Sequence, residues 1–119
     1  MDDRGRLVFK IAGHEEWSAA TRHGRYSGSA DDVRDGYIHL SSAGQIAGTL
    51  ARHFAGRSDL VLVAFAEARL GDDLKWEPSR GGALFPHYYG VLDPGVASWV
   101  ELISLTEDGQ HVLPQRSTT

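Results

Sequence analysis

Apolar residues near the start of the chain follow first the spacing of a strand and then that of a helix. Residues 7–11 are apolar apart from Lys10, which predicts a strand containing one residue unsuited to a dry core. Two consecutive glutamates fit the first turn of a short helix, with Trp17 and Ala20 on its apolar face and Gly24 at its end. We therefore expect a strand followed directly by a short helix.

The next segment is predicted to be a loop followed by a second strand. Residues 27–35 are mostly small and polar, which indicates a loop that ends in a turn at Asp35 and Gly36. Residues 37–41 alternate between ring or polar side chains and apolar ones, as expected for one half-buried strand.

The clearest helix signal follows this strand. Ser42 and Gln45 have the spacing of a capping box, in which each side chain accepts a hydrogen bond from the backbone N–H of the other residue. Behind them, Ile46, Leu50 and Phe54 recur every four residues and define one apolar helix face. A glycine two residues further on is expected to end the helix.

The second half of the chain predicts a central strand and a hairpin. Residues 60–65 are apolar without alternation, which is typical of a strand covered on both faces, so Leu62 should lie near the middle of a sheet. Residues 96–105 alternate, and the pair Asp108-Gly109 before residues 111–113 is a hairpin signal.

Together these elements predict an α+β protein with a mainly antiparallel sheet and a few short helices. The strands outnumber the helices, and no repeating strand-helix-strand unit or internal repeat is present. The 119 residues suit a compact single domain, with a core over about 7–113 and a frayed tail over 114–119.

Composition and charge narrow the classes of function. The chain lacks cysteine, which excludes disulfides, thiolate metal sites and cysteine nucleophiles and fits a reducing, cytoplasmic location. The formal net charge of -4 disfavours extended nucleic-acid binding. No apolar run approaches the roughly 20 residues that cross a bilayer. We expect a small-molecule ligand as partner, whereas the oligomeric state is not indicated.

Residues 76–90 carry the strongest signal for a functional site. His87 follows a proline and precedes two tyrosines, which favours a functional role over a structural one. Arg80 with Gly81 and Gly82 could offer a guanidinium and exposed backbone amides to a phosphate or carboxylate, although many surface loops share this sequence. Glu77 could act as a base or only pair with a neighbouring cation.

A second group of polar side chains lies in the predicted strand 37–41. Tyr37, His39 and Ser41 alternate with apolar residues and should therefore share one face. His39 could bond a ligand hydroxyl, carry a proton or bond a backbone carbonyl, and by itself the structural role is favoured.

Common catalytic and metal-binding templates are missing. The sequence has no His-Glu-x-x-His pair or other recognisable metal-ligand pattern, so no metal site is predicted. It also lacks a nucleophile elbow, a Gly-x-Gly-x-x-Gly dinucleotide motif and a phosphate-binding loop ending in Gly-Lys.

Several of these segments together resemble a bacterial family known as domain of unknown function 952. The resemblance spans residues 7 to about 114 and is carried by Val8-Phe9-Lys10-Ile11, Asp35-Gly36-Tyr37-Ile38-His39-Leu40-Ser41, Trp76-Glu77 and Phe85-Pro86-His87-Tyr88-Tyr89-Gly90. It implies the ADP-ribosyltransferase-like fold, a split antiparallel sheet whose cleft binds NAD in active relatives, including RNA 2'-phosphotransferases.

The same resemblance assigns expectations to single positions. Lys10 falls where active relatives carry Arg or His on the first strand, and the segment 36–41 resembles their second motif with its His-Leu-Ser ending. His87 lies near the place usually held by the catalytic glutamate of transferases. An imidazole would stabilise an oxocarbenium-like state less well than a carboxylate. Mono-ADP-ribosylation is therefore disfavoured, while a phosphotransferase-like reaction or ligand binding stays open.

The predicted site residues are consistent with two hypotheses about function. In the first, the protein is an enzyme, a phosphotransferase-like or ADP-ribosyltransferase-like transferase acting on a nucleotide-like or phosphate- or carboxylate-bearing small molecule. Its predicted catalytic residues are His87, His39 and Glu77, and its predicted ligand-binding residues are Lys10, Tyr37, Ser41, Arg80, Gly81, Gly82, Tyr88 and Tyr89. In the alternative, the same cleft belongs to a catalytically silent ligand-binding or protein-interaction module. No cofactor is expected, and NAD is predicted to bind weakly.

Overall fold

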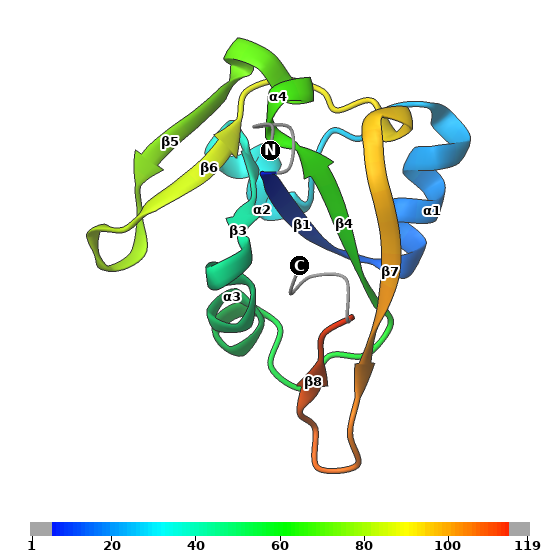
Figure 1. Ribbon diagram of the computed structural model, residues 1–119. Helices are drawn as coiled ribbons and strands as arrows, with labels where there is room; N and C mark the ends of the chain where they lie inside the picture. The colour runs from blue at the N-terminus through cyan, green and yellow to red at the C-terminus, as the bar shows by residue number, and fades with distance from the viewer. Residues whose placement is uncertain (1–5, 115–119) are drawn as a thin grey trace.

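Two antiparallel sheets carry the fold (Figure 1). The computed structural model describes residues 6–114, apart from the side chain of Arg80. The larger sheet has the spatial order β3 (Ser41–Ser42), β1 (Leu7–Gly13), β4 (Leu60–Ala66), β7 (Ala97–Leu105) and β8 (His111–Val112). The smaller sheet has the order β2 (Ile38–His39), β6 (Leu84–Tyr88) and β5 (Leu74–Pro78). The predicted α+β class with antiparallel pairing is confirmed.

Short helices connect and cover the strands. The α-helices are α1 (His14–His23), α2 (Ala30–Asp35), α3 (Ile46–His53) and α4 (Glu67–Leu70). The 3-10 turns are η2 (Ala43–Gln45), η3 (Gly71–Asp73), η4 (Arg80–Gly82) and η5 (Pro94–Val96). Helix α1 ends where expected, because Gly24 adopts the left-handed conformation with φ of 76°.

The larger sheet separates two hydrophobic cores. Trp17 and Ala20 of α1 pack on the face formed by Val8, Val63 and other residues of β1 and β4. The opposite face packs against α3, whose Ile46 and Leu50 lie in the second core. Strand β4 lies between β1 and β7, and Leu62 is fully buried, as its unbroken apolar run predicts.

The prediction of a loop over residues 27–35 is wrong, because helix α2 forms there. Ser29 caps this helix, with its hydroxyl accepting a hydrogen bond from the Asp32 backbone N–H, while the Asp32 carboxylate accepts one from the Ser29 N–H. Gly36, predicted in the turn that ends the loop, instead ends helix α2 in the left-handed conformation. The small polar composition therefore reflected helix caps and an exposed helix face.

The single strand predicted over residues 37–41 is divided in two. Ile38 and His39 pair with β6 in the smaller sheet, whereas Ser41 and Ser42 pair with β1 in the larger one. Leu40 links the two sheets, and its N–H donates to the Pro86 carbonyl. Alternation predicts which face each side chain occupies but not which sheet accepts it.

The segment that contains Trp76 and His87 is a β-hairpin, which the sequence pattern did not predict. Glycines 81 and 82 turn the chain with φ values of 70° and 82°. Pro86 lies in the middle strand of the smaller sheet, a position that proline normally avoids because it cannot donate a ladder hydrogen bond. This departure obscured the strand pattern.

Truncation of the central strand should test the second core. Leu62→Ala removes buried methyl groups and should lower the free energy of unfolding by about 2 to 5 kcal/mol, measured by urea denaturation. The matched control is Leu102→Ala on β7, where the side chain is 64% exposed, and the expected change is within about 0.5 kcal/mol. Equal effects of the two substitutions would contradict the assigned burial.

Candidate functional site

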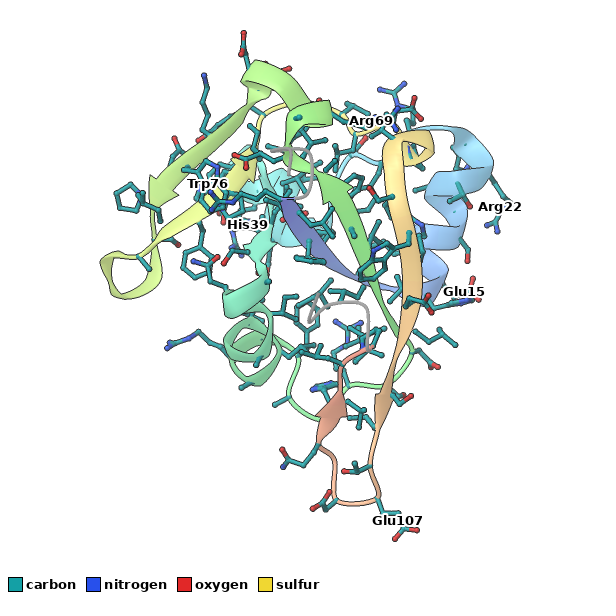
Figure 2. The ribbon with its side chains drawn as sticks, in the orientation of Figure 1. Glu15, Arg22, His39, Arg69, Trp76 and Glu107 are labelled. Atoms are coloured by element: carbon teal, nitrogen blue, oxygen red, sulfur yellow. The ribbon has the colours of Figure 1, made fainter. Side chains whose placement is uncertain are left out.

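A cavity of about 450 Å³ lies where the larger and smaller sheets diverge. It is lined by side chains from β1, α2, the segment 37–41, α3 and the β5–β6 hairpin. Figure 2 shows His39, one of its lining residues, on the side of the molecule that carries the hairpin, while Arg22 on α1 projects from the other side. Elements far apart in sequence thus meet at one concavity, as expected for a binding site.

The carboxylate of Asp32 organises the cavity floor. Its Oδ2 accepts hydrogen bonds from Lys10 Nζ at 2.7 Å and from the Ser29 N–H at 2.9 Å. Its Oδ1 accepts one from the His39 N–H at 3.1 Å and lies 2.6 Å from His39 Nδ1. Lys10 also donates to the His39 carbonyl at 3.1 Å. Asp32 and Lys10 are 2% and 5% exposed, so the two opposite charges compensate each other inside the protein.

Opposing influences act on the pKa of Asp32. Burial is the largest single influence and raises the pKa, because it disfavours the charged form. The hydrogen bond with His39, the charge of Lys10 and the other hydrogen bonds together outweigh burial and hold the Asp32 pKa well below its ordinary value. Asp32 is therefore a permanent carboxylate at neutral pH.

His39 is held between two carboxylates. Its Nδ1 faces Asp32, and its Nε2 lies 3.0 Å from Asp35 Oδ2. Both ring nitrogens can donate to carboxylates only when the imidazole carries its second proton. Asp35 is a carboxylate, since its pKa is lowered mainly by the hydrogen bond from Arg34. The two contacts thus fix the orientation of the His39 ring at the cavity wall.

A second imidazole and carboxylate pair lies on the neighbouring strand. His87 Nδ1 is 2.7 Å from Glu77 Oε1, which also accepts a hydrogen bond from the Tyr89 hydroxyl at 2.7 Å. The pKa of Glu77 is lowered, first by the bond from Tyr89 and then by the bond from His87. In return, the hydrogen bond to Glu77 raises the pKa of Tyr89 to about 12. His87 itself is buried and lines the cavity.

Tyr37 connects the two histidines. Its ring stacks on His87 with a centroid distance of 4.1 Å and an interplanar angle of 24°. It also contacts His39 at 4.7 Å and Tyr89 at 5.3 Å, with tilted geometry. These contacts restrict rotation of both imidazoles, as a preorganised site requires.

Two smaller features help to position the residues of the cavity. The hydroxyls of Ser41 and Thr49 lie 3.0 Å apart, so one donates to the other. Gly28 has φ of 107°, and a Cβ atom there would come within 2.6 Å of the Asp32 Cβ. A residue with a side chain at position 28 would displace Asp32, which explains why the chain uses glycine there.

The structure brings most of the predicted site residues together. Five of them line the cavity: Lys10, Tyr37, His39, Ser41 and His87. Glu77 joins the site through its hydrogen bond with His87, and Tyr89 joins it by donating a hydrogen bond to Glu77.

The other predicted site residues lie elsewhere or are not described. Tyr88 packs against the first core, because successive residues of a strand face opposite sides of the sheet. Gly81 and Gly82 form the exposed hairpin turn and are not among the described residues that line the cavity. The side chain of Arg80 lies outside the described part of the structure.

Asp32, Asp35, Thr49 and Arg52 are among the residues of the site that the sequence did not reveal. Asp32 and Asp35 were assigned to a loop, although Ser29-x-x-Asp32 has the spacing of a capping box and could have revealed the helix. Thr49 lies beside the apolar stripe of α3, where a threonine carries no signal of its own.

No metal or membrane signature accompanies this site in the described part of the chain. Over residues 6–114, no group of three or more histidine or acidic side chains is arranged to hold a metal ion. In the same range, no helix combines the length and the apolar character needed to span a membrane.

Comparison with known proteins identifies the family. Residues 11–100 match the family described as "Protein of unknown function (DUF952)", and the chain belongs to this family. The crystal structure of protein CC0527 from Caulobacter crescentus is similar, with 43% sequence identity and a TM-score of 0.90 over 95% of this chain and 99% of that chain. Its solution NMR structure is 47% identical, with a TM-score of 0.78 over 87% and 89% of the two chains. No curated protein matches the chain significantly.

Neutralising Asp32 should destabilise the protein strongly. Asp32→Asn leaves the buried Lys10 ammonium without its counter-charge, and the free energy of unfolding should fall by about 3 to 5 kcal/mol. Asp31→Asn is the matched control, because the Asp31 side chain is 67% exposed and its pairing with Arg34 contributes about 0 to 1 kcal/mol. Urea denaturation at pH 7 measures both changes, and a loss no larger for Asp32→Asn than for the control would refute the charge compensation.

The lowered pKa of Asp32 also predicts a dependence of stability on pH. The unfolded carboxyl takes up a proton near its ordinary pKa of about 3.9, whereas the folded one resists protonation. Stability from this group is present above about pH 4 and is lost as the pH falls toward the folded pKa. Between pH 4 and pH 2.5, stability should therefore fall more steeply in the wild type than in Asp32→Asn. Parallel curves would be inconsistent with a depressed pKa.

Proposed function

We propose that the protein binds a small, nucleotide-like or phosphate- or carboxylate-bearing molecule in this cavity and acts on it by proton transfer through His87. The observation that carries the proposal is the buried imidazole of His87, which lines the cavity and has its Nδ1 fixed 2.7 Å from the Glu77 carboxylate. A histidine oriented by a carboxylate is a recurrent general acid or base.

The tautomer of His87 follows from its partner. Glu77 is ionised at neutral pH and can only accept hydrogen bonds, so His87 Nδ1 must donate. In the neutral ring, Nε2 then carries the lone pair and can take a proton from a ligand hydroxyl. After protonation, the same nitrogen can return the proton to a leaving group. Glu77 stabilises the imidazolium at that stage, and Tyr37 keeps the ring plane in place.

The other side chains of the site support binding more than proton transfer. His39 and Lys10 are each engaged with Asp32, so we assign them to shaping and orienting the ligand pocket. Ser41 contributes a hydroxyl to the wall. This division of roles supports an enzyme with one reactive histidine and one orienting histidine.

The ADP-ribosyltransferase-like fold belongs to the same proposal. This fold assignment is supported by the division of β2 and β3 between the two antiparallel sheets, with the cavity at the point where the chain passes from one sheet to the other. By this analogy the reaction would be a transfer to or from a ribose or phosphate group. A shared fold does not determine the reaction, so the proposed function rests on the residues of the site.

A catalytically silent binding module is the second candidate. The specific observation in its favour is that Asp32, Lys10 and His39 satisfy one another, which leaves them suited to shaping a pocket and unsuited to reacting.

A thermal-shift screen of metabolites followed by turnover assays separates the two candidates. With a ligand found in this way, His87→Gln should lower the turnover rate about 100- to 10,000-fold while ligand affinity changes much less. His23→Gln on α1, an exposed histidine, is the control and should keep full activity. A ligand that binds the wild type tightly but is never converted would support the silent module and refute the enzyme.

NAD is predicted to be a poor ligand. Lys10 and His87 stand where active relatives of the resembled fold carry other groups, and each lost charged hydrogen bond costs roughly 1.5 to 3 kcal/mol. Two such losses weaken binding by about two to four decades. Calorimetric titration should therefore show weak or undetectable NAD binding and no release of nicotinamide. Micromolar binding with nicotinamide release would instead establish a transferase of the ordinary type.

A further inference from the structure

Helix α3 presents a polar face to the cavity as well as an apolar face to the core. Ile46 and Leu50 are buried in the second core. Thr49 and Arg52 are three residues apart, which places them one above the other on a different side of the helix, and both line the cavity. The cavity therefore extends from the His87 pair along β3 to the last turn of α3.

The hydroxyls of Ser41 and Thr49, on this side of the cavity, together keep one hydrogen-bond donor that neither uses for the other. Ser41 is 3% exposed, and its Oγ lies 3.0 Å from Thr49 Oγ1. Either hydroxyl can donate to the other, and the second hydrogen of the pair is then left for a group in the cavity. Serine and threonine hydroxyls that line a cavity in this way suit a ligand with several acceptor oxygens.

The charged side chains that line the cavity are paired with opposite charges, except at the end formed by α3. Asp32 is paired with Lys10 at 2.7 Å, and Arg34 is paired with Asp31 at 3.1 Å and with Asp35 at 3.0 Å. All three acidic residues that line the cavity thus already have a cationic partner.

Arg52 differs from the other cations of the cavity. Within residues 6–114 the Arg52 side chain has no hydrogen-bond or ion-pair partner, although it lines the same space. A guanidinium that lines the same cavity as one spare hydroxyl donor attracts an anion and matches the oxygen geometry of a phosphate.

We infer that Ser41, Thr49 and Arg52 form an anion subsite that holds a phosphate group of the ligand, at the α3 end of the cavity. The inference rests on the proposed function for the cavity being a ligand site, and it specifies the ligand class as a phosphomonoester. The phosphate lies at α3, and the group that exchanges a proton lies at His87. This placement differs from the anion site expected at Arg80, Gly81 and Gly82, whose glycines form the hairpin turn.

Titration with inorganic phosphate and with glycerol 3-phosphate tests the subsite directly. Two-dimensional NMR of the wild type should show saturable shifts of the backbone amides of residues 41, 49 and 52. Arg52→Gln should weaken the affinity about tenfold or more, because it removes a charge-assisted contact. Thr49→Val should weaken it severalfold. Arg22→Gln, on the opposite side in Figure 2, should leave it unchanged. Melting temperatures close to that of the wild type establish that each variant is folded.

The outcomes separate this inference from the proposed function. His87→Gln should keep phosphate affinity within about twofold. If phosphate does not bind the wild type, or if Arg52→Gln binds as well as the wild type, the subsite is refuted while the His87 chemistry can still hold for another ligand. Loss of binding in Arg80→Ala alone would place the anion at the hairpin turn and also refute the subsite. Phosphate binding at α3 together with an inert His87 would support the subsite and refute the enzyme.

Discussion

A carboxylate that is 2% exposed can stay ionised only if the protein surrounds it with donors and positive charge, and Asp32 meets that condition through four contacts. Those contacts come from β1, the α2 cap and β2, so one side chain joins three separate elements. Three of the four contacts also hold Lys10 and His39 in place. The shape of the cavity floor is therefore a consequence of neutralising one buried charge.

The position of the site follows from the way the chain moves between sheets. Within five residues it leaves β2 of the smaller sheet, passes Leu40 and enters β3 of the larger one. Because β3 is short, only Val8 and Phe9 of β1 pair with it, and Lys10 lies beyond the last pair. The space at this branch is occupied by polar side chains in place of a third strand pairing.

Much of the fold could be predicted from the sequence because its strongest signals are local. The unbroken apolar run of β4 and the four-residue spacing of α3 depend on burial alone, and both predictions are confirmed. The break at Leu40 and the hairpin that contains Pro86 depend on pairing with distant strands, which no local pattern encodes. For the site, ring and charged residues in unusual settings pointed to His39 and His87. Asp32 was missed because a short capped helix has the same composition as a loop.

The identity of the residue at position 28 is coupled to the position of the Asp32 side chain, which has a consequence for related sequences. Because a Cβ at position 28 would lie 2.6 Å from the Asp32 Cβ, and because φ there is 107°, the two positions cannot vary independently. Any side chain at 28 requires Asp32 to move, which would break the contacts of Lys10 and His39 at once. A lineage that kept the buried charge would be confined to glycine at this position, whereas one that lost the charge would be released from that restriction. A residue other than glycine at position 28 of a related sequence would thus indicate that this arrangement around Asp32 is not retained there.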